Sequence, residues 1–445
     1  MRILSHMYHL GYGWGGGSVT MCLVLEALRR RGHEITLLLQ RGEFDSAQTH
    51  GGCEFGIRDV FSDPPPRQKR DLYEAADIIL TQGEATIEAL ALCANYDKPL
   101  VHMIHDEGQL ARYKAHPSHV QLALYNAQWV MEAAERKGRY DNAMVLYPLI
   151  EPAHYRVDET GDALVLVNCC EEKGGQLFWE LARLMPERRF LGVYGGWGWQ
   201  IIPKPMLPNC EVMDHTLDPR DIYRQTRIVL MPSQDLGTPR TIPWTESYGR
   251  IGIEAAASGI PTIAHPTPGL MESLGASGTF CDRYDPSQWI EAIRALDVEA
   301  EYADVSAAAL KRSGELAPGP QLDALELALE QVRTDWAGRP AEQIDRGVGD
   351  LGLTADGNGH LTVRTLRRVA GAKPGDLLEV TMERAKDLLR RRLAECVEDD
   401  KAAETQGSGG ELPVGVVAKA KAGGGVLRRA ARAIGMCDAT GPVPR

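Results

Sequence analysis

Glu246 and Glu254 are two carboxylates separated by seven residues, and their spacing suggests chemistry more directly than any other pair in this sequence. The pattern predicts a helix over 247–257. Glu246 would then stand at its N-terminus, where free N–H groups and a partial positive charge favour phosphate binding. Glu254 would lie roughly 10–12 Å further along the axis, beyond the roughly 5–9.5 Å that separates the two carboxylates of a glycosidase. We therefore expect the two to contact different parts of one long ligand, although the spacing alone also fits an amphipathic helix with a capping acid.

The segment around these carboxylates, MPS…ESYGRIGIEAAASGIPTIAHPTPGLMESLG, resembles the Glu-x7-Glu signature of the retaining glycosyltransferases of family 4, which have the GT-B architecture. The resemblance implies that Glu246 lies beside the transferred sugar and that Glu254 binds the ribose hydroxyls of the nucleotide. The usual Glu-Gly-Phe-Gly opening of the family is Glu246-Ser247-Tyr248-Gly249 here, and Gly249 still allows the backbone to approach a diphosphate.

A glycine-rich loop over residues 11–17, GYGWGGG, follows the first predicted strand and precedes a helix. From Gly11 to Gly16 it satisfies the Gly-x-Gly-x-x-Gly pattern of dinucleotide-binding proteins. However, the second predicted strand does not end in the acid that would bind a ribose. The family resemblance implies instead that the N–H groups of Gly15, Gly16 and Gly17 face the phosphates of the sugar donor.

The segment over residues 172–175, Glu-Lys-Gly-Gly, opens a predicted helix in the second half of the chain. A cation is disfavoured at this end of a helix unless an anion such as a diphosphate binds there. The segment is similar to the diphosphate-binding lysine motif of the family, which implies that role for Lys173. The family usually has an arginine five residues earlier, where this chain has Asn168, so Arg240 or Arg250 could supply the missing positive charge.

His102 and His105 lie near the end of a predicted buried strand. Side chains alternate between the two faces of a strand, so we expect one of the two histidines to enter a cleft beyond the strand end. His105-Asp106 resembles the strand-end histidine of the family that contacts the transferred sugar, which implies a catalytic role for His105.

Three further residues are possible ligand contacts. Trp197 and Trp199 follow another predicted strand and could stack on a sugar or base, or cover the lobe. Gly269, followed by Glu272, resembles a Gly-Gly-x-x-Glu turn of the family, which implies a place beside the base or the sugar.

Alternating strands and helices predict two parallel sheets, each built from βαβ units. The expected fold class is α/β, with two Rossmann-like lobes facing across a cleft. Residues 1–150 would form the acceptor lobe, with strands over 2–7, 34–39, 77–81, 100–104, 122–125 and 144–147. Residues 151–340 would form the nucleotide-sugar lobe, with strands over 164–167, 190–194, 211–213, 228–231 and 262–264. Helices are predicted over 19–31, 176–185, 219–225, 247–257, 286–296 and 321–336.

The chain changes character beyond residue 340. Residues 341–400 predict a small α+β module with a strand over 376–380 and a helix over 381–393. Its leucine pattern is loosely similar to modules of phage structural proteins, which suggests a phage-encoded protein. Residues 401–445 predict a flexible basic tail, either solvated or in contact with an anionic partner.

Composition limits the class of protein. The 445 residues are 44% hydrophobic and 25% charged, with a net charge of −12 that argues against a DNA-coating protein. The nine cysteines form no Cys-x-x-Cys pair, and no run of about 18 apolar residues or signal peptide is evident, so we expect a reduced, cytoplasmic protein without a membrane span. No Asp-x-Asp triplet occurs, and we expect no metal and no cofactor.

The resemblance covers residues 1–335 and implies a retaining hexosyl- or pentosyltransferase. Its donor would be a UDP-, GDP- or similar nucleotide sugar, and its acceptor a hydroxyl of a protein, glycan, lipid, metabolite or modified DNA. Two alternatives stay open: an NAD(P)-dependent oxidoreductase that uses the Gly11–Gly16 loop, and a non-catalytic nucleotide-sugar binding protein on the same scaffold.

Overall fold

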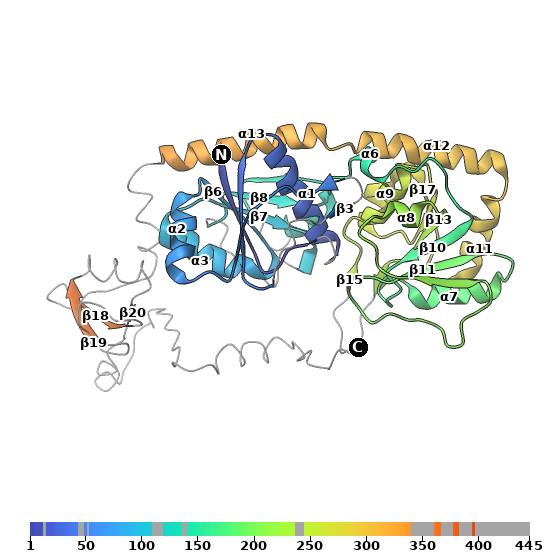
Figure 1. Cartoon of the computed structure of the whole chain (residues 1–445), viewed down its shortest axis with the longest axis horizontal. Helices are drawn as coiled ribbons and strands as arrows, with labels where there is room; N and C mark the ends of the chain where they lie inside the picture. Colours follow the sequence, from blue (N-terminus) through green and yellow to red (C-terminus); the bar gives the residue numbers. More distant parts are fainter. Residues whose placement is uncertain are drawn as a thin grey trace, which may run out of the picture. The chain divides into compact units, whose positions relative to one another are not determined.

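The computed structural model describes residues 1–11, 15–42, 49–50, 53–108, 119–135, 140–235 and 244–339, together with three strands near the C-terminus. Met1–Arg339 form one compact unit and Pro340–Arg445 a second one. The first unit contains two parallel sheets, each covered by helices (Figure 1). Parallel sheets need cover on both faces, which accounts for the nearly continuous apolar runs in their strands.

The first lobe is built on a seven-stranded sheet in the order β5-β2-β1-β6-β7-β8-β9. Its strands are β1 (Arg2–Met7), β2 (Glu34–Leu39), β5 (Asp59–Ser62), β6 (Ile78–Gln82), β7 (Leu100–Ile104), β8 (Leu122–Tyr125) and β9 (Ala143–Val145). Its helices are α1 (Gly16–Arg30), α2 (Pro66–Ala75), α3 (Thr86–Tyr96) and α5 (Gln128–Glu135). A separate hairpin of β3 (Thr49–His50) and β4 (Cys53–Glu54) comes between β2 and β5 in the chain.

The second lobe is built on a six-stranded sheet in the order β12-β11-β10-β13-β16-β17. Its strands are β10 (Ala163–Val167), β11 (Phe190–Val193), β12 (Cys210–Met213), β13 (Thr226–Met231), β16 (Thr262–Ala264) and β17 (Gly278–Phe280), with a hairpin of β14 (Gln234–Asp235) and β15 (Trp244–Thr245). Its helices are α7 (Gly175–Leu184), α8 (Arg220–Tyr223), α9 (Arg250–Ala256), α10 (Pro268–Leu274), α11 (Pro286–Ala295) and α12 (Glu299–Glu315). The short helix α6 (Pro152–Tyr155) lies in the connection between the lobes.

The predicted α/β fold with two Rossmann-like lobes is confirmed. The predicted helix over 247–257 begins too early, because α9 starts at Arg250. Gly249 precedes it with φ at +81°, a left-handed conformation that cannot belong to the helix. The strands β5 and β17 and the helix α12 were not expected from the sequence.

The last helix of this unit, α13 (Gly319–Gly338), returns to the first lobe. Figure 1 shows it in orange along that lobe, whereas α12 covers the second. Its apolar face, Leu322, Leu325, Leu329 and Val332, is buried in the core of the first lobe. The predicted second lobe, residues 151–340, therefore ends too late, because α13 at its end packs on the first lobe.

The second unit contains an antiparallel sheet in the order β19-β18-β20, formed by β18 (His360–Thr365), β19 (Leu377–Thr381) and β20 (Ala394–Cys396). β19 overlaps the strand predicted over 376–380, while β18 was not expected. The predicted helix over 381–393 and the tail over 401–445 lie outside the described residues, except for Thr381, which ends β19. Among the helices that the structure describes, none is long and apolar enough to cross a bilayer.

Candidate active site

A cleft of about 570 Å³ lies between the two lobes, where the carboxyl ends of strands in both sheets face it. Most of the predicted site residues line it: Gly15, Gly16, Gly17, His105, Asn168, Lys173, Trp197, Glu246, Ser247, Tyr248, Gly249, Arg250 and Glu254. Trp199 does not line the cleft and is 89% exposed. Gly269 lies outside the lining as well, and Arg240 lies outside the described residues.

The glycine-rich loop brings the start of α1 close to the second lobe. Gly15 has φ at +109°, a backbone conformation that residues other than glycine rarely adopt. A Cβ atom on Gly15 would lie 3.6 Å from the Trp197 ring, and one on Gly16 would lie 3.4 Å from Cδ of Arg250. A Cβ on Gly17 would approach the His105 ring to 3.3 Å. The loop therefore lies among three predicted site residues, two of them from the other lobe.

Lys173 and Glu246 form an ion pair in the wall of the cleft. Their side chains are 17% and 10% exposed, and Lys173 Nζ lies 5.9 Å from the centre of the Trp197 ring. Lys173 stands just before α7, the helix end that disfavours a cation. Glu246 supplies the compensating negative charge in this structure.

Asn168 holds the loop that carries Trp197. Its Nδ2 donates to the carbonyl oxygen of Trp197 at 3.0 Å, and its Oδ1 accepts from Nε2 of Gln200 at 2.7 Å. Gln200 Oε1 in turn accepts from the backbone N–H of Cys169 at 3.0 Å and of Gly195 at 3.1 Å. Gln200 gave no signal in the sequence, because its role depends on contacts about 30 residues away.

Glu254 is almost fully buried at 2% exposure, and both of its carboxylate oxygens have partners. Oε1 lies 2.9 Å from Nη2 of Arg250, and Oε2 accepts from the hydroxyl of Tyr223 at 2.8 Å. Tyr223 was not among the predicted site residues. Its hydroxyl stands at the end of α8, which the sequence placed correctly as a helix but without a role.

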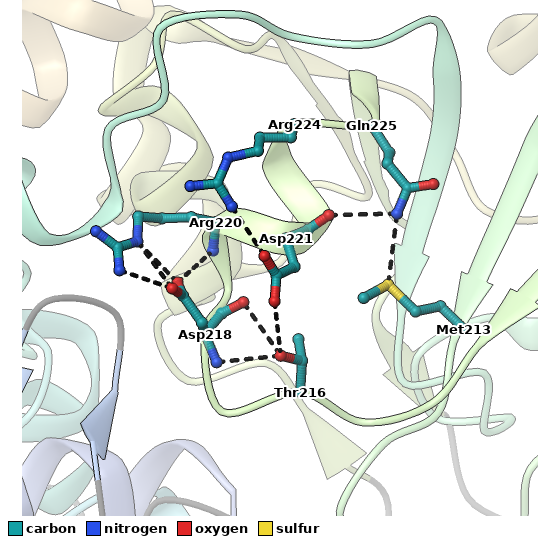
Figure 2. Close-up of polar contacts among 7 residues, drawn as sticks. All are labelled: Met213, Thr216, Asp218, Arg220, Asp221, Arg224 and Gln225. Atoms are coloured by element: carbon teal, nitrogen blue, oxygen red, sulfur yellow. Dashed lines mark hydrogen bonds and ion pairs between the residues drawn. The ribbon is translucent and has the colours of Figure 1, made fainter.

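The segment that leads into α8 carries a dense polar network (Figure 2). Asp218 accepts from Arg220 Nη2 at 2.6 Å, and its backbone N–H donates to Thr216 Oγ1 at 3.1 Å. Arg224 donates to Asp221 at 2.8 Å. Thr216 lines the cleft, and Tyr223, whose hydroxyl contacts Glu254, follows in the same segment.

His105 is buried, and its Nε2 forms a hydrogen bond with the side-chain oxygen of Gln82. Burial, and then the nearby charge of Arg250, lower the pKa of His105 to about 4. The imidazole is therefore neutral at pH 7 and is suited to hydrogen bonding rather than to carrying charge. His102 is fully buried away from the cleft, where its ring contacts the hydroxyl of Thr86 at 3.2 Å.

Gly269 supports the turn before α9 from behind. A Cβ atom on Gly269 would lie 2.4 Å from the carbonyl oxygens of both Glu246 and Ser247, so only glycine allows this close approach. Glu272, in the same predicted turn, accepts from the backbone N–H groups of Gln128 at 2.6 Å and Trp129 at 3.0 Å. The structure thus places this carboxylate at the N-terminus of α5 in the first lobe, and it is not among the residues that line the cleft.

The described residues contain no group of three or more His, Cys, Asp and Glu side chains arranged to hold a metal ion.

Comparison with known proteins gives a family match over part of the chain. Residues 191–299 match the family described as Glycosyl transferases group 1. The matched residues include Glu246, Glu254, Tyr223 and Trp197. D-inositol 3-phosphate glycosyltransferase 1 of Catenulispora acidiphila is 28% identical over 148 residues, which cover 33% of this chain and 31% of that protein. D-inositol 3-phosphate glycosyltransferase of Corynebacterium kroppenstedtii is 35% identical over 81 residues, which cover 18% of this chain and 16% of that protein. The chain therefore spans less than a third of the length of these curated relatives.

Solved structures share the fold over a longer range. Anabaena HepE, solved in complex with UDP and glucose, matches with a TM-score of 0.57 at 14% identity, covering 76% of this chain and all of that one. An alpha-glucosyltransferase in complex with UDP and a 13-mer DNA containing a HMU base matches with a TM-score of 0.53 at 13% identity, covering 75% of this chain and 99% of that one. The fold is GT-B.

Proposed function

We propose that this protein is a retaining glycosyltransferase that takes a sugar from a nucleotide diphosphate sugar bound in the cleft. One observation carries the proposal. The glycine-rich loop, the Lys173–Glu246 pair and Glu254 come from both lobes and line the same cleft. Its volume of about 570 Å³ lies in the range of small-molecule sites, and the family match covers the part of the chain with both carboxylates.

The diphosphate would bind between the N–H groups of Gly15 to Gly17 and the ammonium of Lys173. Lys173 would exchange its partner Glu246 for the diphosphate, and Glu246 would then orient the sugar. Cationic and N–H groups fixed in place before the reaction stabilise the negative charge that develops on the leaving diphosphate. Such electrostatic stabilisation is usually the largest contribution to the rate enhancement. Glu254 would bind the ribose hydroxyls, and neutral His105 would form a hydrogen bond with the sugar.

Retention of configuration rests on the resemblance to family 4 and would proceed by attack on the same face within an ion pair. The acceptor would be a hydroxyl compound bound on the side of the first lobe, where Tyr8, His9 and Glu84 line the cleft. We propose a UDP- or GDP-sugar as donor and no requirement for a metal or cofactor. The cytoplasmic location and the phage origin stay predictions.

A thermal-shift panel of UDP-glucose, UDP-N-acetylglucosamine, GDP-mannose and ADP-glucose tests the donor, because a ligand that binds the folded state raises its melting temperature. At least one should do so, and the protein should then hydrolyse it slowly in the presence of EDTA. Anomeric coupling constants of the first transfer product, measured by NMR, test retention. Binding without hydrolysis or transfer would leave the non-catalytic alternative, and an inverted product would overturn retention.

The oxidoreductase alternative depends on Gly13 of the glycine pattern, which lies outside the described residues. Tight NADH binding by fluorescence titration, together with no melting shift by any nucleotide sugar, would favour it over the proposed function.

A further inference from the structure

Arg250 is a buried cation that joins three separate parts of the chain. It is 8% exposed and is the first residue of α9. Its Nη1 donates to Thr20 Oγ1 on α1 at 3.2 Å, and its Nη2 donates to the Tyr155 hydroxyl on α6 at 3.0 Å. Nη2 also lies 2.9 Å from Glu254 Oε1. One guanidinium thus contacts the first lobe, the connection between the lobes and a carboxylate of the second lobe.

This arrangement fixes the Glu254 carboxylate before any ligand binds. Arg250 contacts one oxygen, and the Tyr223 hydroxyl contacts the other. Each carboxylate oxygen has two lone pairs, so each keeps capacity for one hydroxyl of a ligand. A carboxylate oriented in this way presents two acceptors in fixed geometry, which suits two adjacent hydroxyl groups.

The contacts of Arg250 place its charge at this carboxylate rather than at a diphosphate. Nη2 donates to the Tyr155 hydroxyl and also forms the ion pair with Glu254. The stem of Arg250 packs against the start of α1, where a Cβ on Gly16 would lie 3.4 Å from its Cδ. A shift of α1 would therefore act directly on the guanidinium that holds Glu254.

We propose that Arg250 is the positioning residue for Glu254 and that, through Thr20, it makes nucleotide binding depend on the first lobe. This inference rests on the proposed function, in which Glu254 binds the ribose. A nucleotide would then recognise the arrangement of both lobes through its ribose, although no residue of the first lobe needs to touch the ribose itself.

Thr20→Val and Thr20→Ser provide a matched pair, because valine keeps the shape of threonine and serine keeps its hydroxyl. The experiment measures binding of UDP and of 2′,3′-dideoxy-UDP to the full chain by isothermal titration calorimetry. GDP and ADP, each compared with its 2′,3′-dideoxy form, are further probes. We expect Thr20→Val to bind UDP about three- to tenfold more weakly than the wild type, the loss typical of one hydrogen bond. Thr20→Ser should bind nearly as well as the wild type.

The dideoxy nucleotide separates positioning from general damage. If Arg250 acts through the ribose, Thr20→Val and wild type should bind 2′,3′-dideoxy-UDP equally. Arg250→Lys, which keeps the charge but not the fork of donors, should lose UDP affinity in the same ribose-dependent way. Thr81→Val removes a buried hydroxyl that donates to the His6 carbonyl oxygen at 2.8 Å. Thr81 is not among the residues that line the cleft, so this variant serves as the control with unchanged binding.

Two outcomes lead to different conclusions. Equal weakening of UDP and dideoxy-UDP by Thr20→Val, or no weakening of either, would overturn the inference and leave the proposed function intact. A wild-type protein that binds none of UDP, GDP and ADP would overturn the proposed function and the inference with it. A thermal melt of each variant shows whether it is folded.

Discussion

At the scale of single residues, two internal ion pairs lie in the cleft. Lys173 is paired with Glu246, and Arg250 with Glu254, and all four are largely buried. A buried charge without a partner carries a large desolvation cost, and the pairing offsets that cost for these four side chains. A nucleotide sugar would therefore bind by exchange of partners, with its diphosphate taking the place of one carboxylate.

The Lys173–Glu246 pair leads to a prediction in which the two residues affect different kinetic constants. Lys173→Met should raise KM for the nucleotide sugar by about 10- to 100-fold, because a hydrogen bond to a charged group contributes roughly 1.5–3 kcal/mol. Glu246→Gln keeps the shape of the side chain and releases Lys173, so it should mainly lower kcat while KM changes little. Steady-state kinetics with varied donor concentration measures both constants.

Glu272→Gln serves as the control for Glu246→Gln, because Glu272 binds backbone N–H groups of α5 rather than a cation of the cleft. It should affect the melting temperature more than KM. Equal and small effects of Lys173→Met and Glu246→Gln on both constants would contradict the roles assigned to the pair.

The sequence identified residues that belong to short motifs but not the residues that hold them. Lys173, Glu246 and Glu254 were found because local patterns carry them, and the structure places all three in one cleft. Thr20 and Arg250 are 230 positions apart, and Gln200 acts on residues about 30 positions away. Such contacts depend on how the sheets are packed, and no local pattern encodes them.

At the scale of elements, the position of Glu246 depends on a turn rather than on a helix. The residues Glu246–Gly249 come before α9, and Gly249 allows the chain to enter it in a left-handed conformation. A Cβ on Gly249 would lie 2.4 Å from Leu270 Cδ2, so the Leu270 side chain on α10 would have to shift. The turn is therefore fixed by a glycine and by the helix packed behind it.

We predict that Gly249→Ala destabilises the protein by about 2–5 kcal/mol, the sum of the cost of a left-handed residue with a side chain and the cost of a forced contact in the core. It should also weaken binding of UDP, because the turn carries Glu246. Thermal unfolding and UDP titration measure the two effects.

Gly314→Ala is the matched control, since Gly314 lies within α12 and a Cβ there meets no atom within 4 Å. Alanine in a helix is favoured over glycine by roughly 0.5–1 kcal/mol, so this variant should be slightly more stable than the wild type. An unchanged melting temperature for Gly249→Ala would contradict the importance of the turn.

Element bounds followed from the sequence where apolar runs were short and bordered by turn residues. The bounds of β1, β2, β7, β8 and β16 agree with the predicted ranges. The start of α9 was predicted three residues early, with Glu246 as a capping acid in front of it. The structure instead uses Gly249, which makes no side-chain cap bond. A left-handed glycine is hard to recognise in sequence, because glycine also fits loops and close contacts.

At the scale of the whole molecule, four buried histidines should make the fold sensitive to acid. Burial is the main cause that lowers the pKa of His6, His50 and His105 to about 4 and of His102 to about 3. In the unfolded chain the pKa of histidine is about 6.5. Between these values the unfolded state binds more protons, so stability is fully present above about pH 6.5 and is lost as the pH falls toward 4.

Each of these histidines should cost roughly 2 kcal/mol of stability at pH 4.5, and four together are comparable to a typical free energy of unfolding of about 5–15 kcal/mol. We predict a steep fall of the melting temperature between pH 6.5 and pH 4.5. Differential scanning calorimetry across this range measures it. A melting temperature that stays constant from pH 7 to pH 5 would contradict the neutral, buried state of these side chains.

The helix α13, at the end of the first unit, packs against the first lobe. Its apolar spacing predicted a helix, but the pattern could not tell which lobe the apolar face would cover. In the structure Leu325 is 1% exposed within the core of the first lobe, and Leu327 on the other side of the helix is 72% exposed. The first lobe is therefore completed by residues that come after the whole second lobe in the chain.

We predict that Leu325→Ala destabilises the protein by about 2–5 kcal/mol, the usual cost of emptying a buried leucine site. Leu327→Ala removes the same atoms from the same helix but should change stability by less than about 0.5 kcal/mol. Hydrogen exchange measured by mass spectrometry locates the effect. Protection should fall in α1 and β8, which contact α13, more than in the sheet of the second lobe. Equal loss of protection in both lobes would mean that the two lobes unfold as one unit, and similar melting temperatures for the two variants would mean that α13 is not docked on the first lobe.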